Sequence, residues 1–438
     1  MGNAEKQQAC FPSVADINSL QLRLLQQHLA YLQKASPYYQ GLFRDIGFSV
    51  DQFQTLADLQ RLPLTGKPEL SAHNRDFLAV AEAQVVDICQ TSGTTGAPVT
   101  IWQTESDLQR LAQNEQQAFV AAGIKCSDRV LVGAALDRVF MAGLAYFLGL
   151  RKIGATAIRA GSGQPALVAE LIRLQRPNVL VGVPSLLLGV AHQLAASGHS
   201  PGELGVEKLI CIGEPVRDPG LNLSALGAAL QQQWQAEVFS TYASTELATA
   251  FADCTAGCGG HLQPELVFVE IIDEQGQAVV SGEPGEVVVT PLGVEATPLL
   301  RYRTGDIASL HSEPCRCGRQ TPRLGPIIGR RAQMLKCRGT TLFPGAISSA
   351  LQEIAGVRGH YLEVHQDFDL SDRIRVVVGC KDDSVSAEAV AAQIAAKTRV
   401  KPDVVLVSPE EISNKIIRPD QRKPVTFFDC RQRDPEQE

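Results

Sequence analysis

Residues 91–96 read Thr91-Ser92-Gly93-Thr94-Thr95-Gly96, a run of hydroxyl side chains interrupted by glycines. Glycine lets the backbone fold closely around an anion, because no Cβ stands in the way. The hydroxyls and the backbone N–H groups can then donate hydrogen bonds to phosphate oxygens. Most isolated Ser/Thr/Gly strings are solvated turns, so this segment alone allows a phosphate loop without establishing one.

A second glycine-containing segment lies far along the chain and reads Tyr302-Arg303-Thr304-Gly305-Asp306. Its Asp306 carboxylate is suited to accept hydrogen bonds from two neighbouring hydroxyls, such as those of a ribose. A phosphate loop and a ribose-binding carboxylate in one chain predict a nucleotide that is held at both ends.

Length and charge exclude several classes of function. At 438 residues the chain exceeds the size at which a single core stops growing, so we expect two or three domains. The formal net charge of −7 leaves no diffuse basic surface for nucleic acid or anionic lipid. The first residues contain no apolar stretch of signal length, and no later run reaches about 18 apolar residues. We therefore expect a cytoplasmic protein that binds a small molecule and has no nucleic-acid or membrane partner.

The chain divides into two predicted domains, a core of residues 1–329 and a smaller domain of residues 330–438. Within the core, leucines at helical spacing predict a helical cap over residues 17–75. Apolar runs alternate with amphipathic stretches over residues 85–245, which predicts a mainly parallel α/β region. Short strands with hairpin signals predict a β subdomain over residues 260–329.

The smaller domain is expected to be a compact α+β unit. Helical patterns cover residues 347–354 and 386–397, and strand patterns cover residues 361–364, 373–378 and 403–407. The predicted fold class is thus α/β, with a large N-terminal domain of mainly parallel sheets plus a β subdomain, and a small α+β C-terminal lid.

With further motifs between and after the first two, the chain resembles the adenylate-forming superfamily of acyl-CoA synthetases. The segments that carry this resemblance are, in order, Thr91–Gly96, Tyr242-Ala243-Ser244-Thr245-Glu246, Tyr302–Asp306, Gly329-Arg330 and Arg338-Gly339. Within this superfamily, the sequence resembles the phenylacetate-CoA ligase branch more closely. The motifs that carry this closer resemblance are Ser36-Pro37-Tyr38-Tyr39, Gly213-Glu214-Pro215, Met334-Leu335 and Phe343-Pro344. The resemblance extends from about residue 20 to residue 432.

The resemblance implies two half-reactions. A carboxylate attacks the α-phosphate of ATP to give an acyl adenylate and pyrophosphate, and a thiol, usually that of coenzyme A, then displaces AMP. Two related readings remain open: loading of a carrier protein, or transfer of AMP to another acceptor. A third reading is a non-catalytic relative that binds a nucleotide through the same fold. Relatives also include dimers, so a homodimer is possible.

The resemblance assigns roles to the residues of these motifs. Residues Thr91, Ser92, Gly93, Thr94, Thr95 and Gly96 would bind the β- and γ-phosphates. The Tyr242 ring would stack on adenine, the Thr245 hydroxyl would reach the α-phosphate, and Glu246 would hold Mg²⁺, a cation that prefers oxygen ligands. The alternative for Glu246 is a carboxylate at a helix start, stabilised by the helix dipole.

Two further groups of residues complete the implied nucleotide site. Gly213, Glu214 and Pro215 would contact the nucleotide, Asp306 would bind the ribose, and Arg330 would share the ribose or a phosphate. An ordinary Arg–Asp pair at a hinge is the alternative for the last two.

Near the C-terminus, Gln421-Arg422-Lys423-Pro424 aligns with the family segment that carries the adenylation lysine. Lys423 would then bridge the attacking carboxylate and the α-phosphate and reduce the repulsion between them.

The chain departs from the family pattern at three places. Ala97 stands where a lysine usually follows the loop glycine, so one phosphate contact is either missing or supplied by Lys67 or Arg303. Ala332 stands in a hinge that usually contains an acidic residue, and this puts in doubt how the lid moves. Arg422 replaces the glycine that usually precedes the terminal lysine.

Five cysteine and histidine side chains predict a metal site. Cys254, Cys258 and His261 share one glycine-rich connection, and Cys315 and Cys317 lie in another. Thiolates and imidazole are the ligands that Zn²⁺ takes tetrahedrally, and these five candidates compete for four places. A subset of the resembling branch carries a pattern that selects Cys254, His261, Cys315 and Cys317, and leaves Cys258 in reserve. Reduced thiols without metal are the alternative.

The sequence does not identify the substrate acid. By family analogy its pocket would be lined by residues 136–147, residues 160–163 and the residues just before Tyr242. Within the first stretch, Phe140 and Met141 could contact an apolar or aryl group. Asp137 or Arg138 could meet a polar one.

Overall fold

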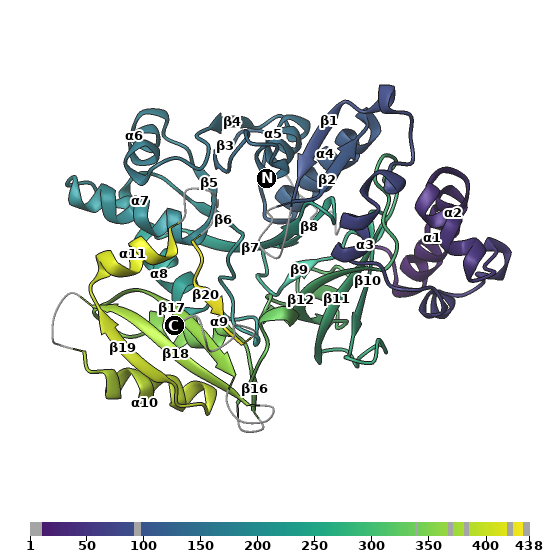
Figure 1. Cartoon of the computed structure of the whole chain (residues 1–438). Helices are drawn as coiled ribbons and strands as arrows, with labels where there is room; N and C mark the ends of the chain where they lie inside the picture. Colours follow the sequence, from purple (N-terminus) through teal and green to yellow (C-terminus); the bar gives the residue numbers. More distant parts are fainter. Residues whose placement is uncertain are drawn as a thin grey trace. The chain divides into compact units, whose positions relative to one another are not determined.

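The computed structural model describes residues 11–91, 98–337, 340–366, 371–380, 385–417 and 424–431 (Figure 1). The chain forms two compact units. The larger contains residues 1–304 and 308–326, and the smaller contains residues 305–307 and 327–438. The predicted boundary after residue 329 lies just inside the smaller unit, which also takes a short piece of an earlier strand.

A parallel half-sheet lies at the centre of the larger unit. Its strands, in spatial order, are β4 (Thr156–Arg159), β3 (Arg129–Gly133), β5 (Val179–Gly182), β6 (Lys208–Ile212) and β7 (Glu237–Ser244). Alternate side chains enter two different cores, so that Leu180 and Leu209 pack on one face while Val181 and Ile210 pack on the other. A sheet that is apolar on both faces must be covered on both, which is typical of parallel α/β sheets.

Helices cover the two faces of this half-sheet. Residues of α6 (Pro165–Gln175), α7 (Pro184–Ala196) and α8 (Ala225–Trp234) join the core of one face. Residues at the C-terminal end of α4 (Glu105–Ala121) and of α5 (Met141–Ile153) join the core of the other. Among the helices that the structure describes, none has both the length and the apolar character needed to cross a bilayer.

Beyond β7 the same sheet becomes antiparallel. It continues through β8 (Thr249–Asp253), β9 (Gly260–His261), β13 (Arg323–Leu324), β12 (Tyr302–His311), β11 (Pro284–Pro291) and β10 (Val267–Ile272), while β14 (Gly329–Arg330) pairs with β12. A separate hairpin contains β1 (Asp87–Gln90) and β2 (Thr100–Gln103). The strands predicted as a β subdomain therefore extend the parallel sheet.

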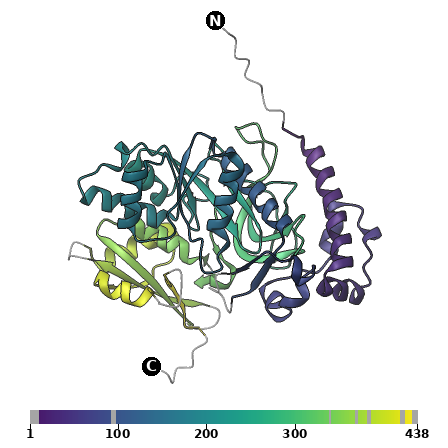
Figure 2. The same cartoon turned by 90° about the horizontal axis from the view of Figure 1, so that it is seen from above.

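The N-terminal helices pack against the antiparallel half (Figure 2). They are α1 (Val14–Ala35), α2 (Pro37–Asp45) and α3 (Lys67–Ala72). Ser13 and Asp16 form a capping box that starts α1. Further along α1, the Gln21 amide donates to the Val267 carbonyl at 3.1 Å, and His28 Nε2 lies 3.0 Å from the Leu299 carbonyl. Burial lowers the pKa of His28 to about 4, so its ring is neutral and donates one N–H to that carbonyl.

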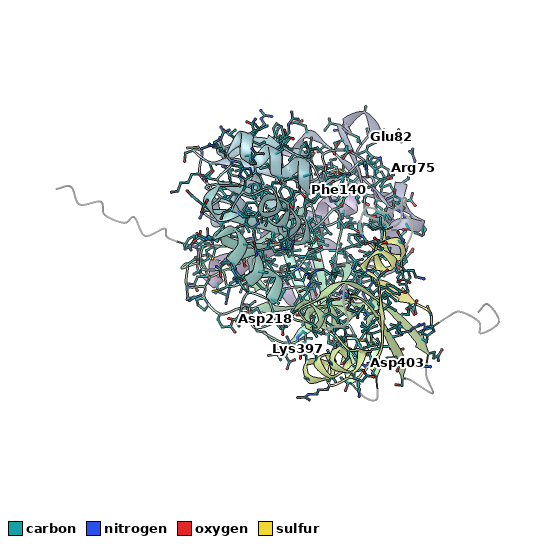
Figure 3. All side chains as sticks on the ribbon, turned by 90° about the vertical axis from the view of Figure 1, so that its left-hand side faces the viewer. Arg75, Glu82, Phe140, Asp218, Lys397 and Asp403 are labelled. Carbon is teal, nitrogen blue, oxygen red and sulfur yellow. The ribbon has the colours of Figure 1, made fainter. Side chains whose placement is uncertain are left out.

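The smaller unit is an α+β domain with its own core. Its sheet has the order β19 (Asp403–Val407), β18 (Asp372–Cys380), β17 (Val357–Gln366) and β20 (Phe427–Asp429). Helices α9 (Pro344–Gln352), α10 (Ala387–Thr398) and α11 (Pro409–Ile416) and the hairpin β15 (Leu335–Cys337)–β16 (Thr340–Leu342) complete it. Lys397 and Asp403, at the end of α10 and the start of β19, are labelled in Figure 3.

One carboxyl group is buried in the helical layer over the parallel half-sheet. Glu115 on α4 is 4% exposed and accepts a hydrogen bond from the Asn114 amide at 3.1 Å. It lines a small cavity of about 10 Å³, together with Tyr146 and Thr241. The Thr241 hydroxyl has no hydrogen-bond partner among the described residues. Burial raises the pKa of Glu115 to about 8, because a weakly polar environment disfavours the carboxylate.

We predict that Glu115→Gln flattens the dependence of stability on pH. The ordinary pKa of this side chain is 4.5, so the unfolded chain loses the proton well before the folded chain does. The stabilising contribution of the protonated form is complete below pH 4.5 and is lost as pH rises to about 8. Denaturant midpoints measured from about pH 5 to about pH 8 should therefore fall less in the variant than in the wild type. Glu170→Gln, at an exposed position of α6, is the control, and its denaturant midpoint should depend on pH as in the wild type. The same pH dependence in Glu115→Gln would contradict a protonated, buried Glu115.

Candidate functional site

Thr91 lies directly after β1, where the β1–β2 hairpin opens. Its backbone N–H donates to the Val99 carbonyl at 3.0 Å, and its hydroxyl accepts from the Val99 N–H, also at 3.0 Å. The threonine is 5% exposed, so its side chain closes the hairpin. The other predicted phosphate-loop residues, Ser92 to Gly96, lie outside the described residues, as does Ala97.

The hairpin between β7 and β8 carries the motif Tyr242–Glu246. Tyr242 pairs with Phe251 across the hairpin, and their rings stack with centroids 5.9 Å apart. Thr245 is 8% exposed, and Glu246 follows it in the loop. Strand pairing therefore fixes the base of the loop, and the loop presents a hydroxyl and a carboxylate side by side in sequence.

The start of β12 lies beside this loop. The Tyr302 hydroxyl donates to Glu246 Oε1 at 3.5 Å, which brings the second and third predicted motifs together. Tyr302 also forms a parallel bridge with Thr65, so the segment leading to Lys67 runs alongside β12. Arg303 Nε contacts both carboxylate oxygens of Glu286 at 3.1 Å, an ion pair that already occupies this guanidinium.

Asp306 and Arg330 face each other on two paired strands of the smaller unit. Their backbones are in register between β12 and β14, and Arg330 Nε lies 3.3 Å from Asp306 Oδ1. Asp306 is 8% exposed, whereas the Arg330 side chain is 40% exposed. The carboxylate is thus oriented by a neighbouring cation. This geometry agrees with a ribose-binding pair and equally with a pair that braces the strands.

The predicted segment Gly213-Glu214-Pro215 follows β6. The Glu214 carboxylate accepts from the backbone N–H of Ser185 at 2.9 Å and from its hydroxyl at 2.8 Å. Ser185 lies in the first turn of α7, where a carboxylate satisfies free N–H groups and complements the helix dipole. In this structure Glu214 therefore serves as a helix cap.

The candidate acid-pocket residues lie between β3 and α5. Asp137 and Arg138 are exposed and face each other at 3.7 Å, and Phe140 is half-buried (Figure 3). Arg138 and Val139 both adopt left-handed backbone conformations, with φ of 58° and 53°. This conformation is uncommon for a β-branched residue and often marks a functional loop. Met141 is buried in a small cluster with Cys89, Leu111 and Ala145.

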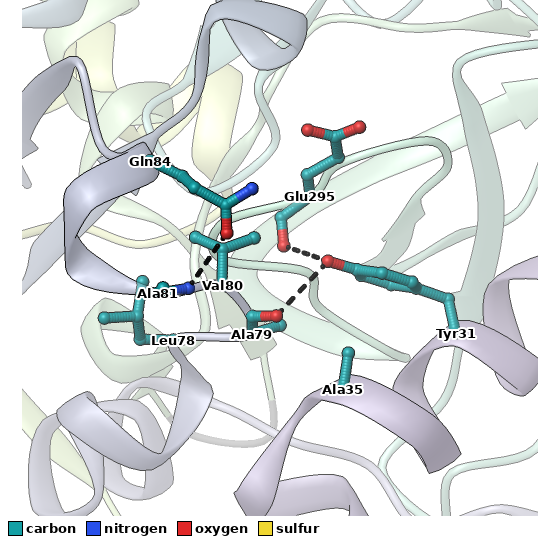
Figure 4. A pocket seen from close by; sticks show the side chains of 8 residues that line it. All are labelled: Tyr31, Ala35, Leu78, Ala79, Val80, Ala81, Gln84 and Glu295. Atoms are coloured by element: carbon teal, nitrogen blue, oxygen red, sulfur yellow. Dashed lines mark hydrogen bonds between the residues drawn. The ribbon is translucent and has the colours of Figure 1, made fainter.

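A surface hollow of about 460 Å³ lies elsewhere in the larger unit (Figure 4). Tyr31 and Ala35 on α1, residues 78–81, Gln84 and Glu295 line it. The Tyr31 hydroxyl donates to the Glu295 carbonyl at 2.9 Å. Its described lining contains none of the predicted site residues. We therefore do not assign it to the substrate.

Lys423 lies outside the described residues. Two described residues that flank its segment are joined directly: the Val425 N–H, after the segment, donates to the Ile416 carbonyl, before it, at 2.8 Å. β20 then joins the sheet beside β17. The two ends of the segment are therefore fixed to α11 and to the sheet of the smaller unit.

Four side chains of the larger unit converge on one point, and three of them are buried. The ligand atoms of Cys254, His261, Cys315 and Cys317 all lie within 4.8 Å of one another. The sulfur atoms of Cys254 and Cys315 are 3.7 Å apart, and Cys317 Sγ lies 3.5 Å from His261 Nε2. A tetrahedral zinc ion with Zn–S bonds of about 2.3 Å requires sulfur atoms about 3.8 Å apart. The spacing of these residues therefore fits zinc.

The protonation of His261 also suits a metal. Burial, with the nearby charges of Arg319 and Arg323, lowers the pKa of His261 to about 4, so its ring is neutral and has a lone pair to offer. The other ring nitrogen, Nδ1, lies 2.8 Å from the Thr321 hydroxyl, which fixes the orientation of the ring. Cys258 points elsewhere: its thiol donates to the Ala256 carbonyl at 3.1 Å, and Arg316 contacts its sulfur at 3.1 Å.

A buried ion pair next to this cluster has no counterpart among the sequence predictions. Arg217 Nε lies 2.7 Å from Asp253 Oδ2, and Asp253 is fully buried. The same carboxylate accepts from the N–H groups of Ser240 at 2.8 Å and Gly259 at 3.1 Å. Asp253 thus ties β7 to the loop that follows Cys254. A single arginine and a single aspartate far apart in sequence gave no signal of this contact.

Family models match most of the chain. Residues 47–294 match the model described as AMP-binding enzyme, and residues 339–431 match the AMP-binding enzyme C-terminal domain. Among solved structures, 2-hydroxyisobutyryl-CoA ligase in a postadenylation state superposes with a TM-score of 0.85. It is 22% identical, and the match covers 97% of this chain and 91% of that one.

Curated relatives agree with the family models. The phenylacetate-coenzyme A ligase of Thermus thermophilus is 31% identical over 79% of this chain and 77% of the relative. The phenylacetate-coenzyme A ligase of Escherichia coli is 30% identical over 85% of each. With these matches and with two of the predicted motifs in contact, the chain belongs to the adenylate-forming family of AMP-binding enzymes, in its phenylacetate-CoA ligase-like branch.

Proposed function

We propose that the chain is an AMP-forming acid–thiol ligase that activates an aryl or small organic acid with ATP and transfers the acyl group to coenzyme A. The observation that carries this proposal is the β7–β8 loop, which presents Thr245 and Glu246 next to the Tyr302 hydroxyl. The names of the curated relatives support the choice of phenylacetate or a related acid.

In the first half-reaction a carboxylate oxygen of the acid attacks the α-phosphorus of ATP, and pyrophosphate leaves. Two anions must approach each other, so donors fixed in advance lower the barrier most. Thr245 would donate its hydroxyl to the α-phosphate, Tyr242 would stack on the adenine, and Glu246 would supply an oxygen ligand for Mg²⁺. Mg²⁺ would neutralise charge on the phosphates.

In the second half-reaction the thiol sulfur attacks the acyl carbon, and AMP leaves. The AMP portion must stay bound through this step. Asp306 would accept hydrogen bonds from the ribose hydroxyls, and the Arg330 guanidinium at 3.3 Å would keep this carboxylate oriented.

The purified protein should release pyrophosphate from ATP and Mg²⁺ only when a suitable carboxylic acid is present. A panel that starts with phenylacetate, benzoate and small hydroxy acids tests the substrate class by isotope exchange between ATP and pyrophosphate. Adding coenzyme A should then give a thioester and AMP. If a product forms only with a phosphopantetheinyl carrier protein, that protein is the acceptor in place of coenzyme A. If none of the acids supports exchange between ATP and pyrophosphate, the proposed function is wrong.

Lys423→Ala should abolish the first half-reaction and spare the second. Removing a cation that bridges the two anions should slow acid-dependent pyrophosphate release by about 100-fold or more, whereas thiolysis of a supplied acyl adenylate should change little. Lys415→Ala is the control, because the Lys415 ammonium lies over the rings of Tyr361 and Phe428 and has no proposed role in the reaction. Equal loss of both half-reactions in Lys423→Ala would contradict the assignment.

We further propose that Cys254, His261, Cys315 and Cys317 hold a structural zinc ion. Four protein ligands leave no open position for substrate, so the metal would stabilise the loops that follow β8 and β12. The spacing of the four ligand atoms and the neutral His261 ring support this proposal.

Elemental analysis should find about one zinc ion per chain. Cys315→Ser should lose the metal and lower the thermal unfolding midpoint, because three remaining ligands bind zinc much more weakly. Cys258→Ser should keep the metal, since its sulfur lies outside the cluster. A folded wild-type protein without zinc, or loss of zinc in Cys258→Ser alone, would contradict the proposed ligand set.

A further inference from the structure

A buried arginine on α4 contacts the loop that carries Thr245 and Glu246. Arg110 is 7% exposed, and its side chain ends at the exit of the β7–β8 loop. Its Nη1 donates to the Ala248 carbonyl at 2.5 Å, and its Nη2 donates to the Thr249 hydroxyl at 3.0 Å. The same guanidinium also reaches two carbonyls in other segments, Leu292 at 2.6 Å from Nε, and Leu266.

The loop needs such a contact because of its backbone. The last pair of the β7–β8 ladder is Ser244 with Thr249, so only residues 245–248 form the loop. Ala248 adopts a left-handed conformation with φ of 47°. Residues with a Cβ rarely adopt this conformation unless surrounding contacts hold it, and glycine is the usual choice. The bond from Arg110 fixes the carbonyl of this strained residue, two positions after Glu246.

The acceptors around Arg110 are unusual for a buried cation. Within the described part of the chain, its hydrogen bonds go to three carbonyls and one hydroxyl. The nearby Asp107 carboxylate uses its oxygens on the backbone N–H groups of Thr104, Glu295 and Ala296. Burial lowers the pKa of Arg110 to about 10, so it stays charged at neutral pH. Removing a charged group from water is costly, and here the backbone carbonyls replace the water.

We propose that Arg110 is a positioning residue for the adenylation step: it holds the β7–β8 loop in the conformation that presents Thr245 and Glu246 to MgATP. This inference rests on the proposed function for the roles of those two residues. The contact itself does not depend on that function. A fixed loop matters because displacements of about 1 Å at a phosphate-binding centre can slow a reaction about 100-fold.

Arg110→Lys separates positioning from simple core stability. Lysine keeps the charge, but a single ammonium cannot reproduce the planar fork that serves several acceptors at once. We expect the Mg²⁺ concentration required for half-maximal exchange to rise and kcat for pyrophosphate release to fall by about 10- to 100-fold. Thiolysis of a supplied acyl adenylate should slow less than pyrophosphate release does, because that step uses the Thr245 contact with the α-phosphate but not the metal.

Arg217→Lys is the matched control. Arg217 has a largely buried side chain, 8% exposed, and is also multiply hydrogen-bonded, to Asp253, Leu221 and Val238, but it contacts the opposite end of β7. It should lower the thermal unfolding midpoint while leaving the Mg²⁺ dependence unchanged. If both variants lose stability alike and neither alters Mg²⁺ dependence, Arg110 only fastens the core and the inference is wrong.

Two further measurements keep the inference testable by itself. Backbone hydrogen exchange in a peptide covering residues 243–250 should be at least about tenfold faster in Arg110→Lys than in the wild type, and unchanged in Arg217→Lys. This measurement needs no enzymatic activity. An inactive wild type would therefore refute the proposed function, whereas hydrogen exchange would still show whether Arg110 holds the β7–β8 loop. Adding Ala248→Gly to Arg110→Lys should restore part of the exchange protection, because glycine adopts the left-handed conformation without strain. Unchanged exchange in Arg110→Lys would overturn the inference.

Discussion

The position of β7 in the sheet is the constraint on which the candidate site depends. On one side it pairs in parallel with β6, and on the other it pairs antiparallel with β8. Both of its edges are therefore occupied, and the strand cannot shift without breaking two ladders. In open α/β sheets, ligands bind beyond the carboxyl ends of strands, where the strand order or direction changes. Tyr242, Thr245 and Glu246 lie at this end of β7.

Buried charges secure the hairpin that β7 forms with β8. Arg217 and Asp253 join the start of β7 to the end of β8, and Arg110 contacts the loop between the strands. A buried ion pair often adds little net stability, because desolvation offsets the attraction. Its geometry is nevertheless specific, since removing one partner leaves an uncompensated charge. We infer that these charges select one arrangement of the hairpin more than they stabilise the fold.

The sequence was sufficient for the fold class and for most regular elements. Apolar runs predicted β3, β5, β6 and β7, because strands buried on both faces show little alternation. The sequence separated the strands after residue 260 into a subdomain, whereas hydrogen bonds join β9 through β8 to the parallel half. Strand pairing between distant segments depends on packing, and local composition does not encode it.

The candidate site was predictable where a motif is local and specific. The motifs of Tyr242 and Tyr302 proved to be neighbours, and the spacing of Cys315 and Cys317 pointed to a shared ligand set. Arg110 could not be found in this way, because a lone arginine on an amphipathic helix looks like a solvated side chain. Its contacts lie with residues 138 to 182 positions away, and only the folded chain brings them together.

Asp253 shows how the cysteine–histidine cluster and the β7–β8 hairpin share one structural support. Its carboxylate accepts from Ser240 in β7 and from Gly259 in the loop after Cys254. The next residue along the chain, Cys254, is a member of the cysteine–histidine cluster. The carboxylate that holds Arg217 and the Ser240 N–H is thus adjacent in sequence to a member of the cluster. Cys254 therefore adjoins the end of the β7–β8 hairpin opposite the loop of Thr245 and Glu246, so the cluster and the loop lie at the two ends of one hairpin.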